Sequence, residues 1–155
     1  MSLRSETLQK IWLELIWWVI TGLVTTVILL PILKNTIDYP FLKINVFFII
    51  TLLTFFRYVF FLRFTFLKRL RWAKFILVFL SIPLIFMLVN YLNHFLTHLD
   101  ENSFDSFLIG RADPHLAGYI KSEMLLFGVG SVIISVILPF RMILSLWRQH
   151  NRGTE

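Results

Sequence analysis

The stretch 55–75, FFRYVFFLRFTFLKRLRWAKF, lies between two long apolar runs. Between those runs it carries no acid and five cations, which are Arg63, Lys68, Arg69, Arg71 and Lys74. Short loops that are rich in Lys and Arg stay on the cytoplasmic side of a membrane protein. We therefore interpret 55–75 as a basic cytoplasmic turn that joins two membrane spans.

The composition indicates that the bilayer is the solvent for most of the chain. Of the 155 residues, 57% are hydrophobic and 17 residues are Phe, whereas soluble domains are typically about 45–50% apolar. The net charge of +6 would suit nucleic acid, but the cations flank apolar runs, so we expect no direct nucleic-acid binding. The chain has no cysteine, which excludes disulfides, thiolate catalysis and Cys-ligated metals.

The apolar runs predict an all-α integral membrane protein with one domain, 1–155. A membrane-spanning helix needs about 20 residues, and the predicted spans are 11–33, 41–62, 73–95 and 124–147. We expect them to form an up-down bundle of four helices. A short interfacial helix is predicted in the second outer loop, from a cap at Asn102 or Ser103 to Gly110, with Phe104, Phe107 and Leu108 on one face.

The distribution of Lys and Arg predicts the orientation. Nine of these residues lie on the side of the basic turn and the termini: Arg4, Lys10, Arg63, Lys68, Arg69, Arg71, Lys74, Arg148 and Arg152. Four lie on the other side, at Lys34, Lys43, Arg111 and Lys121. The positive-inside rule then predicts cytoplasmic N and C termini, in what we expect to be the bacterial inner (plasma) membrane.

Glu14, Arg57 and Arg141 are ionisable residues inside the predicted spans, all near the cytoplasmic ends. A charge inside the membrane is costly and tends to face the bundle interior, where it finds a partner. We therefore hypothesise an intramembrane cluster in which Glu14 neutralises Arg57, Arg141 or both. The alternative is that each arginine extends along its own stem to the headgroups.

Two further surfaces are candidates for interactions. The basic junction offers a face for a cytoplasmic partner or for anionic lipids, made of Arg63, Lys68, Arg69, Arg71, Trp72 and Lys74; the alternative is that these cations only set the topology. Gly128, Ser131 and Ser135 share one helix face at i, i+3 and i+7, which predicts a helix-packing face, within the chain or between copies.

The sequence assigns no catalytic residue, cofactor or metal. His94 and His98 are spaced i, i+4 near Asp100 and Glu101, which makes them the candidates for a divalent metal ion. Polar histidines at a helix end, however, need no metal. The chain has no G-x-S-x-G nucleophile setting and no Gly-rich phosphate loop.

Because nearly all of the chain is used for spans, we expect no enzyme. The favoured function is a non-enzymatic subunit that oligomerises, anchors a partner at the basic cytoplasmic face, or does both. The alternative is an oligomeric ion channel or a pore-forming effector, for example of a bacterial stress or anti-phage system. A pore would need polar side chains along a shared axis.

Overall fold

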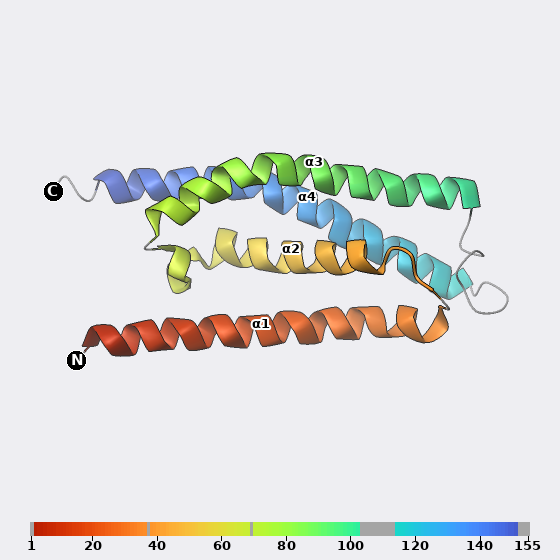
Figure 1. Cartoon of the computed structure of the whole chain (residues 1–155), viewed down its shortest axis with the longest axis horizontal. Coiled ribbons are helices and arrows are strands. Elements are labelled where there is room, and N and C mark those ends of the chain that lie inside the picture. The colour runs from red at the N-terminus through yellow and green to blue at the C-terminus, as the bar shows by residue number, and fades with distance from the viewer. Residues whose placement is uncertain (1, 37, 69, 103–113, 152–155) are drawn as a thin grey trace.

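The computed structural model describes residues 2–36, 38–68, 70–102 and 114–151. It contains four long helices, α1 (Ser2–Asn35), α2 (Leu42–Phe60), α3 (Arg71–Asn102) and α4 (Pro114–Asn151), shown in Figure 1. Two 3-10 turns, η1 (Leu62–Phe64) and η2 (Phe66–Lys68), connect α2 to α3. Each long helix is long and apolar enough to cross a membrane. The prediction of an all-α chain with four such helices is confirmed.

The helices are longer than three of the four predicted spans. Helix α1 begins at Ser2, α3 continues to Asn102, and α4 begins at Pro114. The apolar runs mark only the residues that suit the hydrocarbon core of a bilayer. A helix can continue beyond them through polar residues until a helix-breaking residue ends it. Pro114 is well placed as the first helical residue because its missing N–H would have no partner there. The predicted interfacial helix falls in 103–113, outside the described residues, apart from its cap candidate Asn102, which is the last residue of α3.

The helices run alternately up and down, as Figure 1 shows. The N terminus, the C terminus and the α2–α3 connection lie at one end, which we call the basic end; its described cations include Arg63, Lys68, Arg71 and Arg148. The α1–α2 connection lies at the opposite end. Helix α4 packs against both α2 and α3, whereas α1 lies beside α2 and makes fewer contacts with the other helices. Helix α1 is therefore the least firmly held of the four.

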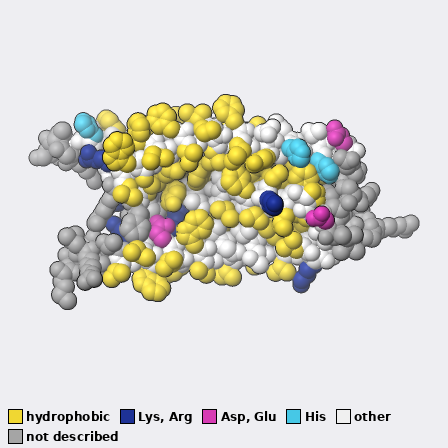
Figure 2. All heavy atoms as spheres, viewed as in Figure 1, with side chains coloured by type: hydrophobic (Ala, Val, Ile, Leu, Met, Phe, Trp, Pro, Cys, Tyr) yellow, Lys and Arg dark blue, Asp and Glu magenta, His cyan; other side chains and the backbone are white. Residues whose placement is uncertain are grey.

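Two apolar clusters fill the interior. The cluster nearer the opposite end is formed by Leu29, Ile32, Tyr39, Phe41, Phe48, Ile49, Leu88, Phe95, Ile120 and Met124. The cluster nearer the basic end is formed by Val59, Leu62, Leu67, Ile134, Leu138 and Met142. Hydrophobic side chains also cover much of the face seen in Figure 2. A surface of this kind suits hydrocarbon, so an apolar interior is combined with an apolar exterior that is compatible with a membrane.

The predicted helix-packing face lies inside the chain. Gly128, Ser131 and Ser135 are all buried on α4. A Cβ atom at Gly128 would lie 2.8 Å from Leu92 Cδ1 and 3.2 Å from Phe48 Cε2. The two serine hydroxyls donate hydrogen bonds to the carbonyls of Gly128 (2.7 Å) and Ser131 (2.6 Å). Small residues with internally satisfied hydroxyls therefore let α2 and α3 approach α4 closely.

Replacing Gly128 by Leu should destabilise the bundle by about 1–3 kcal/mol, because the added side chain meets Leu92 and the buried ring of Phe48. Thermal unfolding in detergent or nanodiscs measures this effect. Gly118→Leu is the matched control, because a Cβ atom at Gly118 has nothing within 4 Å. Equal melting temperatures for the two variants would contradict the proposed packing.

Candidate functional sites: an interhelical ion pair and a basic end

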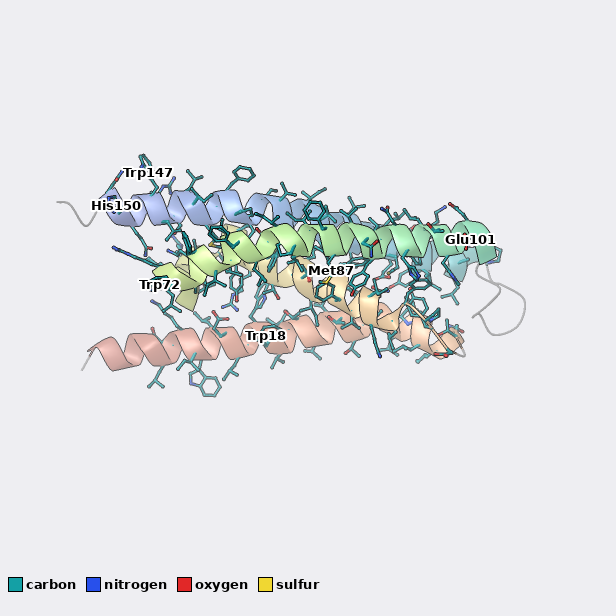
Figure 3. All side chains as sticks on the ribbon, turned by 45° about the horizontal axis from the view of Figure 1, so that its top comes forward. Trp18, Trp72, Met87, Glu101, Trp147 and His150 are labelled. Carbon is teal, nitrogen blue, oxygen red and sulfur yellow. The ribbon has the colours of Figure 1, made fainter. Side chains whose placement is uncertain are left out.

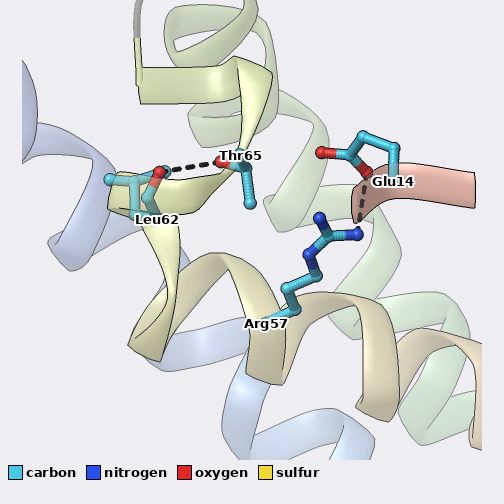
Figure 4. A network of polar contacts seen from close by, with 4 residues as sticks. All are labelled: Glu14, Arg57, Leu62 and Thr65. Carbon is cyan, nitrogen blue, oxygen red and sulfur yellow. Dashed lines mark hydrogen bonds and ion pairs between the residues drawn. The ribbon is translucent and has the colours of Figure 1, made fainter. Parts of the chain in front are cut away.

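Glu14 of α1 and Arg57 of α2 form an ion pair between the two helices (Figure 4). Arg57 Nη1 donates to Glu14 Oε2 at 2.8 Å, and the two side chains are only 6% and 20% exposed, respectively. The Arg57 guanidinium carbon also lies 5.2 Å from the centre of the Trp17 ring, one turn along α1. The cation is therefore held by a carboxylate and by the face of an indole.

The pair forms because the two helices are antiparallel and both residues lie near the basic end. Arg57 lies in the last turn of α2, which ends where the Phe61 N–H donates to the Arg57 carbonyl at 2.7 Å. Beyond it, the hydroxyl of Thr65 donates to the Leu62 carbonyl at 2.9 Å and closes the first 3-10 turn (Figure 4). Arg57 is thus buried against α1 instead of reaching the end of the bundle along its own stem.

Arg141 does not join the pair. Its Nε donates to the Val59 carbonyl at 2.9 Å, so it contacts the last turn of α2 from α4. The final carbonyls of a helix have no partner within that helix, and a nearby cation satisfies them well. Of the three residues in the hypothesised cluster, the structure brings together Glu14 and Arg57. Arg141 instead bonds to a backbone carbonyl of α2.

Most of the predicted basic face is exposed. Arg63, Lys68 and Arg71 lie at the surface, and Trp72 is 82% exposed. Figure 3 shows Trp72 near the end of the bundle that also carries Trp147 and His150. Arg69 lies outside the described residues. These exposed cations and the tryptophan are available to another molecule.

The prediction that Lys74 belongs to the exposed basic face was wrong, because Lys74 is fully buried. Its Nζ donates to the Lys68 carbonyl at 2.9 Å, to Ser145 Oγ at 2.9 Å and to Gln149 Oε1 at 2.8 Å. In the first turn of α3, its side chain thus points to the α4 partners instead of outward. The spacing of basic residues could not reveal this, since the partners are 71 and 75 residues away in the sequence.

The candidate metal ligands pack on an aromatic ring. The rings of His94 and His98 lie 5.7 Å and 5.0 Å from the ring of Phe41, between centroids. Within the described ranges, no group of three or more His, Asp and Glu side chains could hold a metal ion. Because of their i, i+4 spacing, both histidines pack against Phe41, the residue directly before α2.

A second polar contact between helices was not predicted from the sequence. Asn45 Nδ2 donates to Glu123 Oε2 at 2.6 Å, and both side chains are buried between α2 and α4. Tyr39 lies close by: burial raises the pKa of its hydroxyl, and a hydrogen bond with Asn45 opposes that rise. Glu123 directly precedes the predicted span 124–147. The available signal was depth, because Asn45 and Glu123 lie near the same end of α2 and α4, which run in the same direction (Figure 1).

Removing one partner of the Glu14–Arg57 pair should destabilise the bundle. Glu14→Gln leaves the buried Arg57 cation without its carboxylate, and we expect a loss of about 1–3 kcal/mol, reduced by the partial exposure of Glu14. Thermal unfolding of Glu14→Gln, Arg57→Met and the double variant measures the coupling. The double variant should lose less than the sum of the single losses. Additive losses, or an unchanged Glu14→Gln protein, would refute a structural role for the pair.

Comparison with protein-family models, with curated proteins and with solved structures finds no match to this chain.

Proposed function

We propose that the protein is a non-enzymatic multi-span membrane subunit that pairs with a second copy through α1 and holds an acidic partner at its basic end. The observation that carries this proposal is how the chain is used: its four long helices make up nearly all of the described residues. The surfaces that we propose for binding other molecules are the exposed face of α1 and the exposed cations of the basic end.

Helix α1 has two faces with small residues. Thr21 and Thr25 are buried toward the bundle. Gly22 and Thr26 are exposed, and a Cβ atom at Gly22 would have nothing within 4 Å. The Thr26 hydroxyl donates to the Gly22 carbonyl at 2.9 Å, so its donor is already satisfied within the helix. This pair, four residues apart, supports the close approach of a second α1, with the same patch used by both copies.

The basic end supports an acidic partner. Arg71 and Trp72 begin α3 and are both exposed. Exposed tryptophan and arginine are the residues that contribute most often to binding energy at protein interfaces. A partner with acidic side chains would match the charge of this end and would associate faster because of it.

The alternative proposal, an oligomeric channel or pore-forming effector, would place its pathway between copies. The interior of the described bundle is occupied by apolar side chains such as Phe48, Leu88 and Phe95. The hydroxyls of Ser131 and Ser135 are already bonded to the backbone of α4. Ion flux in liposomes separates the two proposals, since a subunit without a channel would pass no current.

The positive-inside rule predicts a cytoplasmic basic end, and engineered cysteines can test this directly because the natural chain has none. Glu101 and His150 lie at opposite ends of the bundle (Figure 3). A membrane-impermeant thiol reagent should label Glu101→Cys in intact cells, and His150→Cys only after permeabilisation. The cysteine-free parent is the control for background, and the reverse labelling pattern would invert the proposed orientation.

Replacing Gly22 by Leu should weaken self-association by roughly tenfold or more, about 1.4 kcal/mol, because the new side chain separates the two copies of α1. Mass measurement in nanodiscs across a range of protein-to-lipid ratios gives the association constant. Gly118→Leu is the matched control on α4, where there is also open space. Undiminished association of Gly22→Leu, or a wild-type protein that is always monomeric, would contradict pairing through α1.

A further inference from the structure

A cavity of about 170 Å³ opens at the basic end, between the α2–α3 connection and the last turns of α4. Its lining contains four cations, Arg63 and Lys68 from the connection and Arg141 and Arg148 from α4. Leu62, Ser145 and Gln149 complete the lining. Cations from two separate parts of the chain therefore converge on one pocket, which a role in helix-end electrostatics alone would not require.

The buried ammonium of Lys74 holds the lining residues of this pocket in place through hydrogen bonds. It donates to Ser145, to Gln149 and to the Lys68 carbonyl. Gln149 Nε2 donates to the same carbonyl at 2.5 Å. Ser145 accepts from Lys74, so its own O–H remains as a donor. Arg141 uses one N–H for the Val59 carbonyl, and a guanidinium has five. The pocket is thus a pre-arranged set of hydrogen-bond donors.

No carboxylate of the described residues lies within salt-bridge distance of these cations; Glu14 with Arg57 is the one ion pair in that part of the chain. A fifth positive charge, that of Lys74, lies directly behind the lining. So many cations at close range repel one another unless an anion joins them. Arginine and ammonium donors fit carboxylate and phosphate alike, and a phosphate group has the larger number of acceptor oxygens for such a set of donors.

We propose that this pocket binds the phosphate of an anionic phospholipid headgroup. The position favours a lipid, because the pocket lies at the end of the membrane-spanning helices, where basic pockets between helices bind anionic headgroups. Exposed aromatic residues directly precede and follow the lining residues Leu62 and Arg63 in the sequence: Phe61 is 45% and Phe64 is 43% exposed, and the Arg63 guanidinium carbon lies 4.3 Å from the Phe64 ring centre. An acyl chain would contact these rings while the phosphate meets the cations.

This inference goes beyond the proposed function and does not depend on self-association. The pocket lining does not include Arg71 or Trp72, the residues proposed for the acidic partner. It also does not include the Gly22 face of α1. Loss of lipid binding and loss of oligomers would therefore be separate results, obtained with different variants.

The test is native mass spectrometry of the delipidated full-length protein with phosphatidylglycerol, and with phosphatidylcholine of the same acyl chains. Phosphatidylglycerol should bind more tightly. Arg148→Gln should weaken its binding about fivefold, and Arg63→Gln with Arg148→Gln by roughly 25-fold. Arg71→Gln removes the same charge from the same end, outside the pocket, and should change binding less than twofold. Unchanged melting temperatures verify folding, and Lys68→Gln, with its exposed side chain, substitutes for any variant that unfolds.

Three results would overturn the proposal. Equal weakening by Arg71→Gln and Arg148→Gln would mean a diffuse basic surface without a pocket. Full displacement of phosphatidylglycerol by millimolar inorganic phosphate would assign the pocket to a free phosphate. Unaltered lipid binding in the double variant, together with loss of a co-purifying acidic protein, would assign these cations to a protein partner.

Discussion

A charge that enters the apolar part of this molecule must meet its counterpart on another helix, and the rest of the bundle depends on that constraint. Arg57 cannot be left alone among the side chains of α2, so Glu14 of α1 contacts it at 2.8 Å. Helix α1 makes few contacts with α3 and α4. The ion pair, reinforced by Trp17, therefore has a large share in determining where α1 lies at the basic end.

The same rule accounts for the other polar contacts between the helices. Asn45 meets Glu123 between α2 and α4, and Tyr119 donates to the Ile28 carbonyl of α1 at 2.8 Å, both toward the opposite end. Lys74 and Arg141 bond to their partners at the basic end. The two apolar clusters fill the interior around these contacts. Non-directional apolar packing lets helices slide or rotate, whereas polar contacts near both ends restrict their register.

These contacts also divide the cations into two groups with different consequences. Arg57 is neutralised within the chain, so it serves the bundle itself. The cations around the pocket at the basic end are not paired with any described carboxylate, and Lys74 adds a charge behind them. A set of cations that the described residues do not neutralise is a physical reason to expect an anion from outside. The functional proposals follow from this difference more than from the helical fold, which many functions share.

The sequence by itself determined the four apolar helices, because runs of about 20 apolar residues are stable as helices in a bilayer whatever their neighbours are. It also indicated that Glu14 and Arg57 need partners, since the cost of burying a charge can be inferred from the span that carries it. The identity of the partner cannot, because it depends on residues far away in the sequence. Only the tertiary structure decided that Arg141 caps the end of α2, that Lys74 turns inward, and that Glu123 bonds to Asn45. Each of those contacts joins residues more than 70 positions apart, and helix rotation and depth decide which of them meet.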